Sequence, residues 1–385
     1  MTQTTPIFPP DPATLKQIHL VLFFTQNMSL LAWEKGGGFH REVALYRALL
    51  PHLGSITFVT YGDKRDLAFA SRLPGITLIC NRWKLPLPWY QRYLTWMAPP
   101  LRKTGAVFKT NQMRGSDIPA ALARKLSQRF LSRSGFSFSF TMKQREGREA
   151  PATQQALELE KRVFEQADRI VVTTALMKTM IINDHGIDPQ KITRIPNYVD
   201  TDLFAPNPTR EPSTKRLIFI GRLEAEKNLF NLIKGLGGLD LECWLVGAGT
   251  LKEKLQQAAQ QGGVTCRFLG SQPHEALPKL LNSATALILP SLYEGHPKTL
   301  LEAMACGLPV IGGDIPAIRE IITHGENGLL TGLEVSDIHQ SVQQLFSQPD
   351  LQTKLGNQAR RYALDHLSLP LIVQQELALL AEMSP

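Results

Sequence analysis

Residues 290–309 read PSLYEGHPKTLLEAMACGLP and place two carboxylates, Glu294 and Glu302, eight residues apart across the junction of a loop and a helix. The apolar run before them, residues 284–289, is short and ends at a proline, which is typical of a buried strand. Apolar residues then recur at helical spacing until a Gly and a Pro end the helix. Both carboxylates therefore follow the carboxyl end of a strand, where unpaired amides of residues 296–300 and the helix dipole would attract an anion.

A second motif carries positive charge. Residues 217–228 read LIFIGRLEAEKN, an apolar strand followed by a turn at Gly221 and by Arg222 and Lys227. A planar Arg fork and a Lys point charge can take up the charge of a diphosphate leaving group as its bond to a sugar breaks. No metal is then required. Taken alone, this segment would also fit a salt-bridged surface loop, and each Glu of the first motif would fit a solvated side chain.

Both motifs closely resemble those of the retaining glycosyltransferases with the GT-B fold, the large E-x7-E family (family 4-like, group 1). Its members often carry the motif GRLxxEKN and, later in the chain, the motif EGxPxxxLEAMAxGxPV. The two motifs of this chain occur in the same order. The resemblance implies an α/β protein of GT-B architecture, with two Rossmann-like parallel-sheet domains facing a deep cleft. It also implies transfer of a hexose from a nucleotide-diphosphate sugar to a glycan or lipid-linked acceptor in cell-surface polysaccharide or glycolipid biosynthesis, with no cofactor and no metal.

The resemblance also distributes roles over the two motifs. The first Glu would contact hydroxyls of the donor sugar, the second would bind the ribose, and the backbone between them would approach the diphosphate. The residues expected to carry catalysis are Arg222, Lys227 and Glu294. The residues expected to bind the donor are Gly221, Gly295, His296, Pro297, Lys298, Thr299, Leu300 and Glu302.

Candidates in the first half of the chain rest on weaker patterns. Three glycines at 36–38 follow the first strand and open a helix, so Gly37 and Gly38 could bring bare amides to a phosphate of the donor. In isolation such a loop is equally typical of a flexible turn. Many family members place a His after the strand near the middle of this domain, whereas this chain departs from that pattern. Polar residues at the strand ends, which could bind an acceptor or simply end their strands, are Lys109, Asn111, Gln112, Arg114 and Arg133.

Alternating apolar strands and helical stretches predict two parallel α/β domains. The Pro- and Asn-rich segment 197–212, which resembles the family's PNGVDxxxF linker with Tyr198 in place of Gly, separates an acceptor-binding domain (1–196) from a nucleotide-sugar-binding domain (213–369). The fold implies that a last helix at about 370–385 packs back on the first domain. Strands are predicted at 18–24, 55–61, 76–80, 106–109, 136–140 and 169–173, then at 216–220, 241–246, 264–268, 284–289 and 308–311.

Charge is unevenly distributed over the 385 residues. The net charge is +8, but residues 1–196 carry +13 and residues 197–385 carry −5. Such asymmetry suggests that the basic half faces an anionic surface. Residues 82–103 interleave Trp and Tyr with Arg and Lys, which fits an anionic membrane surface, while the helical spacing of Trp89, Tyr93 and Trp96 fits packing in the core equally well. Nucleic acid is a poor alternative partner, because no recognised nucleic-acid module is present.

Targeting and redox patterns are consistent with this interpretation. Four scattered cysteines without a CxxC pair indicate neither a disulfide framework nor a zinc site. No signal peptide or membrane-spanning run is recognisable, which predicts a cytoplasmic protein, either free or peripheral at the inner face of the membrane.

The mechanism expected is front-face attack, because Glu294 and Glu302 are both assigned to hydroxyl groups and neither is left beneath the anomeric carbon as a nucleophile. Two alternatives stay open. One is another GT-B enzyme, such as a nucleotide-sugar epimerase or a phosphorylase, and the other is a non-catalytic nucleotide-sugar-binding subunit.

Overall fold

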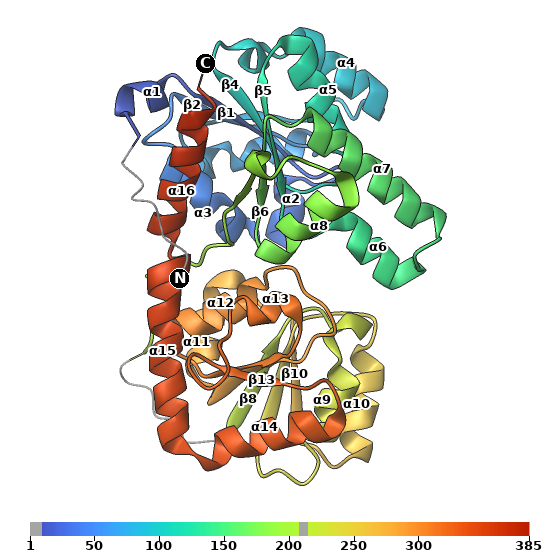
Figure 1. Cartoon of the computed structure of the whole chain (residues 1–385), viewed down its shortest axis with the longest axis vertical. Coiled ribbons are helices and arrows are strands. Elements are labelled where there is room, and N and C mark those ends of the chain that lie inside the picture. Colours follow the sequence, from blue (N-terminus) through green and yellow to red (C-terminus); the bar gives the residue numbers. More distant parts are fainter. Residues whose placement is uncertain (1–9, 208–214, 385) are drawn as a thin grey trace. The chain divides into compact units, whose positions relative to one another are not determined.

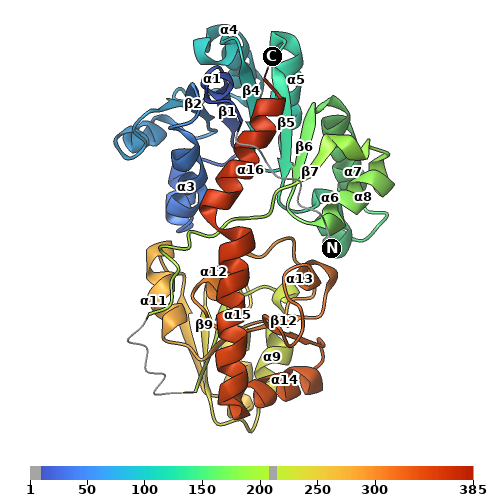
Figure 2. The same ribbon diagram turned by 60° about the vertical axis from the view of Figure 1, so that its left-hand side comes forward.

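The chain divides into two compact units in the computed structural model, which describes residues 10–207 and 215–384 (Figures 1 and 2). The first unit comprises residues 1–196 together with 372–385, and the second comprises residues 197–371. Of the predicted linker, residues 197–207 group with the second unit and residues 208–212 lie outside the described residues. In the described part of the chain, no helix is both long and apolar enough to cross a bilayer.

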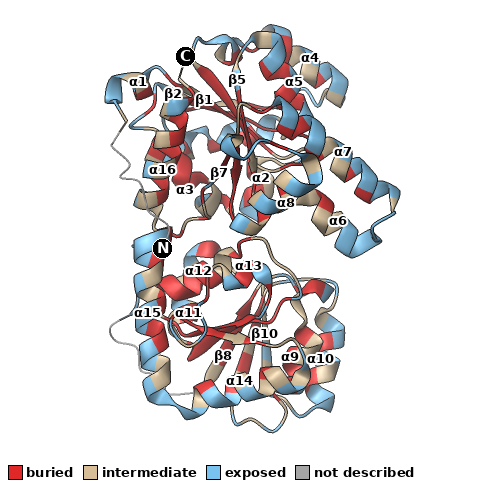
Figure 3. Ribbon diagram, viewed as in Figure 1, coloured by how far each residue is buried: buried red, intermediate tan, exposed pale blue. Residues whose placement is uncertain are grey.

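The first unit is built on a parallel seven-stranded sheet in the order β3-β2-β1-β4-β5-β6-β7. Most residues of the strands are buried, as expected for a parallel sheet with helices on both faces (Figure 3). They are β1 (His19–Phe23), β2 (Ser55–Val59), β3 (Ile76–Ile79), β4 (Ala106–Thr110), β5 (Arg129–Ser134), β6 (Arg169–Val172) and β7 (Ile192–Arg194). The helices are α1 (Pro12–Lys16), α2 (Leu30–Lys35), α3 (Phe39–Leu49), α4 (Leu87–Met97), α5 (Asp117–Leu126), α6 (Phe138–Glu146), α7 (Pro151–Gln166), α8 (Ala175–His185) and, from the other end of the chain, α16 (Leu369–Glu382).

The second unit contains a parallel six-stranded sheet in the order β10-β9-β8-β11-β12-β13. Its strands are β8 (Arg216–Ile220), β9 (Glu242–Val246), β10 (Cys266–Gly270), β11 (Ala286–Leu289), β12 (Val310–Gly313) and β13 (Leu329–Thr331). Its helices are α9 (Leu229–Gly235), α10 (Lys252–Gln261), α11 (Leu277–Asn282), α12 (Lys298–Ala305), α13 (Pro316–Arg319), α14 (Val335–Ser347) and α15 (Pro349–Leu367). The central strands β8 and β11 are neighbours, so the loops after them leave the same edge of the sheet.

One predicted strand is wrong. Residues 136–140 alternate Phe and Ser, a pattern typical of a strand, but β5 has already ended at Ser134 and helix α6 begins at Phe138. Strands β5, β7 and β13 were not predicted; β7 and β13 have three residues each, which are too few to show a periodic pattern.

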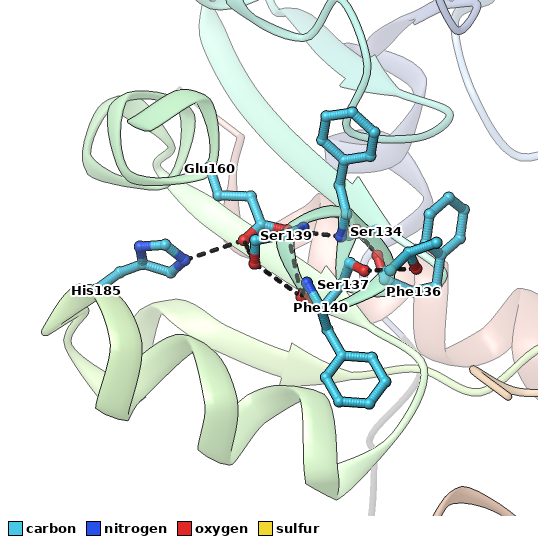
Figure 4. Close-up of polar contacts among 9 residues, drawn as sticks. Ser134, Phe136, Ser137, Ser139, Phe140, Glu160 and His185 are labelled. Carbon is cyan, nitrogen blue, oxygen red and sulfur yellow. Dashed lines mark hydrogen bonds and ion pairs between the residues drawn. The ribbon is translucent and has the colours of Figure 1, made fainter. Parts of the chain in front are cut away.

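A buried carboxylate explains why this segment turns into a helix. Glu160 of α7 accepts hydrogen bonds from the amides of Phe138 (2.7 Å) and Ser139 (3.1 Å) and from the Ser139 hydroxyl (2.5 Å). His185 of α8 lies 3.1 Å from the same carboxylate through its Nε2 atom, and Ser137 caps α6 (Figure 4). The first amides of α6 thus donate to a carboxylate on α7. This tertiary contact favours a helix although the alternation of Phe and Ser favours a strand.

Helix α16 is joined to the first sheet by a buried ion pair. Lys109 of β4 and Glu376 of α16 are 0% and 1% exposed, and the Lys109 Nζ atom donates to Glu376 Oε2 at 2.6 Å. Burial, the larger influence, lowers the pKa of Lys109, while Glu376 acts in the opposite direction. This placement contradicts the prediction that Lys109 binds an acceptor, because its ammonium group lies inside the unit.

We expect Glu376→Gln to lower the free energy of unfolding of the first unit by about 3–5 kcal/mol, because the buried ammonium group would lose its counter-charge. The double variant Lys109→Met/Glu376→Leu should recover most of that loss, because it removes both charges together. Urea denaturation of the parent and both variants measures these differences. Parental stability in Glu376→Gln would contradict the prediction.

Candidate functional site

The loops that follow β8 and β11 contact each other and carry the predicted catalytic residues. The amide of Leu292, in the loop after β11, donates to the carbonyl of Glu226, in the loop after β8, at 2.9 Å. This bond fixes the spacing of the two loops. The sheet order therefore joins two motifs that lie far apart in the sequence.

Lys227 and Glu294 form the central ion pair of this site. Lys227 ends a short 3₁₀ turn (η4, Ala225–Lys227), and its Nζ atom donates to Glu294 Oε1 at 2.5 Å. The Ser291 hydroxyl donates to the same oxygen at 2.7 Å. Both charged side chains are about nine-tenths buried, with 12% and 11% exposed, so solvent screens the pair only weakly. Ser291 was not predicted, although it lies within the first motif.

Arg222 lies in the same loop but is held less tightly. Its guanidinium group donates to Glu226 Oε1 at 2.6 Å, and 63% of the side chain is exposed. The Glu226 side chain is only 9% exposed, so this pair joins a solvent-facing cation to a largely buried carboxylate.

Glu302 occupies the second turn of α12 and is buried. Its Oε1 atom lies 2.9 Å from Nε2 of His274, which begins a 3₁₀ turn (η5, His274–Ala276) after β10. The His274 ring packs against the ring of Phe204, with 5.0 Å between centroids. His274 escaped prediction, because 28 residues separate it from Glu302 and no local pattern links them.

The start of α12 differs in detail from the prediction. The helix begins at Lys298, with Pro297 as its N-cap. The amide of Leu300 donates to the Pro297 carbonyl at 3.1 Å, which contradicts the prediction that it faces a ligand. His296 is buried, and its carbonyl accepts from the Asn197 side chain at 2.7 Å. Lys298 and Thr299 are half-buried in the first turn.

Glycine permits the close approach of the loops after β8 and β9. A Cβ atom on Gly247, which has φ +140°, would lie 1.9 Å from the Gly221 carbonyl oxygen. The amide of Leu223 donates to the Ala248 carbonyl at 2.9 Å in the same contact. The backbone that presents Arg222 is therefore held by a neighbouring loop at a distance that excludes a side chain.

The glycine loop of the first unit has a role other than the predicted one. The amides of Gly36, Gly37 and Gly38 donate to the carbonyls of Ala32, Glu34 and Trp33, respectively. These bonds close the end of α2, after which α3 begins. The prediction that the three amides are bare and bind a phosphate is therefore wrong.

The other first-unit candidates gather at one edge of the sheet. Asn111, Gln112 and Arg114 follow β4, and Arg133 lies near the end of the adjacent strand β5. Gln112 joins the two loops, because its Oε1 atom accepts from the amide of Gly135 at 3.0 Å. Arg114 is exposed, whereas Asn111, Gln112 and Arg133 are half-buried. Within residues 10–207 and 215–384, no group of three or more His, Cys, Asp or Glu side chains could hold a metal ion.

Two known families match this chain over residues 43–362. Residues 201–362 match the family described as Glycosyl transferases group 1, and residues 43–203 match Glycosyltransferase Family 4. The boundary between the matches falls where the second unit begins.

Curated relatives align with a little over half of the chain. The D-inositol 3-phosphate glycosyltransferase of Paenarthrobacter aurescens is 26% identical over 239 residues, which cover 57% of this chain and 58% of the relative. The MMP alpha-(1->4)-mannosyltransferase of Mycolicibacterium hassiacum is 27% identical over 233 residues, which cover 58% of this chain and 56% of the relative. The chain thus spans little more than half the length of these relatives.

The fold is similar to that of Anabaena Alr3699/HepE, solved in complex with UDP, with a TM-score of 0.76 at 15% identity over 95% of this chain and 100% of that chain. The UDP-glucose complex of the same protein gives a TM-score of 0.74 at 17% identity, with 94% of this chain and 98% of that chain covered. At this identity the similarity concerns the fold. The predicted GT-B class, with two parallel sheets covered by helices, is confirmed.

We expect Gly247→Ala to lower the free energy of unfolding of the second unit by at least about 2 kcal/mol, because its methyl group would meet the Gly221 carbonyl and its backbone would be strained. Gly238→Ala is the matched control: Gly238 also has a positive φ (+75°), but its added methyl group would meet nothing within 4 Å. We expect that control to lose about 1 kcal/mol. Equal losses in urea denaturation would show that the loop contact is unimportant.

Proposed function

This chain belongs to the group 1 glycosyltransferases, and from that premise we propose that it transfers a hexose from a nucleoside-diphosphate sugar to a glycan or lipid-linked acceptor. The proposed setting is cell-surface polysaccharide or glycolipid assembly on the cytoplasmic side of the membrane. One observation carries the proposal: Lys227 and Glu294, from two separate motifs, meet at 2.5 Å where adjacent strands end.

The donor is proposed to bind across these strand ends. Lys227 and Arg222 would take the diphosphate, Glu294 would accept hydrogen bonds from the sugar hydroxyls, and Glu302 would hold the ribose. The first turn of α12, from Lys298, adds the positive end of a helix dipole. Anabaena Alr3699/HepE has been solved with UDP and with UDP-glucose, which makes UDP-glucose the first donor to test.

Retention by front-face attack is the proposed mechanism. With donor bound, Glu294 would accept hydrogen bonds from the sugar hydroxyls and from Ser291, which would make its carboxylate a poor nucleophile toward the anomeric carbon. The leaving diphosphate oxygen would instead accept the proton of the attacking acceptor hydroxyl, on the same face of the sugar. Lys227 and Arg222 would stabilise the charge on the diphosphate, so the proposed reaction uses no metal ion.

The acceptor is proposed to bind the first unit at the ends of β4 and β5. Asn111, Gln112, Arg114 and Arg133 remain candidates there, because they gather at one edge of the sheet and include an exposed cation. Amide and guanidinium groups of this kind suit the hydroxyls and phosphates of a lipid-linked glycan.

Donor binding and product analysis test the function directly. UDP-, GDP- and ADP-sugars are screened by thermal shift, because a ligand of the native state raises the melting temperature. The donor found is then incubated with candidate acceptors in EDTA, and the anomeric configuration of the product is determined by NMR. An isomerised donor formed without acceptor would identify an epimerase, and an inverted product or a trapped glycosyl-enzyme would refute front-face retention.

We expect Lys227→Ala to lower kcat by about 10²–10³-fold, because the leaving diphosphate would lose its buried counter-charge. Lys234→Ala, which removes an exposed Lys from α9 of the same unit, serves as the control and should keep parental turnover. Steady-state rates with the donor found above give both values. Near-parental kcat in Lys227→Ala would count against an enzymatic role for this site.

His274 is expected to act through Glu302 as a positioning residue. His274→Leu removes the hydrogen bond to the carboxylate and should raise KM for the donor by at least about tenfold, with little change in kcat. His274→Gln retains an N–H donor and should restore most of the affinity. A general structural defect would instead lower kcat and the melting temperature of both variants, and parental KM in His274→Leu would refute the role.

A further inference from the structure

Three tryptophans of the first unit point into solvent. Trp83, Trp89 and Trp96 are 52%, 61% and 61% exposed, which contradicts core packing of Trp89 and Trp96, whereas Tyr93 is partly buried against the core. Only the opposite side of α4 packs inward: Tyr90 and Leu94 are buried, and the Tyr90 hydroxyl donates to the Thr60 carbonyl at 2.8 Å. Single exposed apolar residues are common, but three large rings within fourteen residues need a reason.

The spacing along α4 places these rings on one face. Trp89 and Trp96 are seven residues apart, which is two helical turns, and the exposed Arg92 lies one turn after Trp89. Trp83, in the turn before the helix, contacts Tyr93 of α4 with 5.1 Å between ring centroids. We call Trp83, Trp89, Arg92 and Trp96 the α4 face; helix α4 itself is labelled in Figure 1.

Cations surround this face. The Arg82 guanidinium lies 4.0 Å from the Trp83 ring centroid, and Lys125 of the neighbouring helix α5 lies 5.2 Å from that of Trp96. Arg102 and Lys103, shortly after α4, are also exposed. Between residues 67 and 145 the sequence holds 14 Lys and Arg but only one acidic residue, Asp117. Carboxylates that could neutralise the face are therefore scarce; Asp63, before this stretch, lies 3.6 Å from Lys84.

We infer that the α4 face docks on an anionic lipid surface. Trp rings are favoured at the level of the lipid headgroups, where their apolar body and N–H group are both accommodated, and each nearby Lys or Arg is attracted to anionic lipid. Nucleic acid fits less well, because stacking of bases needs ring faces and cations already cover a face of Trp83 and of Trp96. The inference identifies a partner of the first unit and does not depend on which sugar the second unit binds.

Vesicle sedimentation with the 385-residue chain tests this inference. The parent should bind vesicles of phosphatidylcholine mixed with phosphatidylglycerol, should bind pure phosphatidylcholine vesicles at least about tenfold more weakly, and should be released by salt. Its tryptophan emission should shift to shorter wavelength on binding. Equal binding to both vesicle types, or no binding to either, would overturn the inference.

Two variants separate the aromatic from the charged contribution. Trp89→Ser/Trp96→Ser should weaken binding at least about tenfold through loss of apolar contact, and Arg82→Glu/Arg92→Glu, at two exposed positions, should do so through charge reversal. Leu67→Ser, which removes another exposed apolar side chain of the same unit, is the control and should bind as the parent does. Parental binding in both double variants would refute the assignment to this face, as would binding to heparin beads without binding to vesicles.

A failure of lipid binding is distinguishable from a failure of the proposed function. All variants alter surface residues of the first unit, so they should retain the parental melting temperature and the thermal shift with donor. If lipid binding is absent while the donor shift persists, only the membrane inference fails. If no donor shifts the parent while lipid binding persists, only the proposed function fails.

Discussion

The ion pair between Lys227 and Glu294 depends on a constraint set by the sheet. Strands β8 and β11 are parallel neighbours, so their loops leave the same edge and the two charged groups meet without any long-range adjustment. The Leu292 amide bond to the Glu226 carbonyl sets the spacing of the loops, and the contact between Gly221 and Gly247 supports the first loop from its other side. The donor site proposed for the second unit thus inherits its geometry from strand order and from two close backbone contacts.

This arrangement has a consequence for the proposed reaction. Without a donor, Lys227 and Glu294 neutralise each other in a place where water screens them weakly. A diphosphate that binds Lys227 would lower the attraction on Glu294 and leave its oxygens to the sugar hydroxyls. The Lys227–Glu294 ion pair would thus stabilise the site before the donor binds. On binding, each partner would exchange the other for a ligand group, so the charged side chains would need little movement when the leaving group departs.

The sequence predicted those strands and site residues that are marked by a pattern of neighbouring residues. Strand β8 was predicted with its observed bounds, because an apolar run stands between polar segments, and Glu294 and Lys227 were found within motifs of a few residues. Two failures share one cause, which is a partner far away in the sequence. Residues 136–140 become the start of a helix because Glu160 takes their amides, and His274 was missed because only the folded sheet brings it to Glu302. The glycine loop failed on a local detail, since its amides donate to carbonyls of α2 only three to five residues earlier.

Helix α16 packs in the first unit although it follows the second unit in the sequence, and this affects the order in which the units can fold during synthesis. Lys109 is made early, whereas Glu376 follows 267 residues later and belongs to the same compact unit. A nascent first unit therefore lacks the counter-charge for Lys109 until residue 376 has been made. The second unit is continuous from residue 197 to residue 371 and has no such dependence, so on the ribosome the later-made unit is in a position to finish folding before the earlier one.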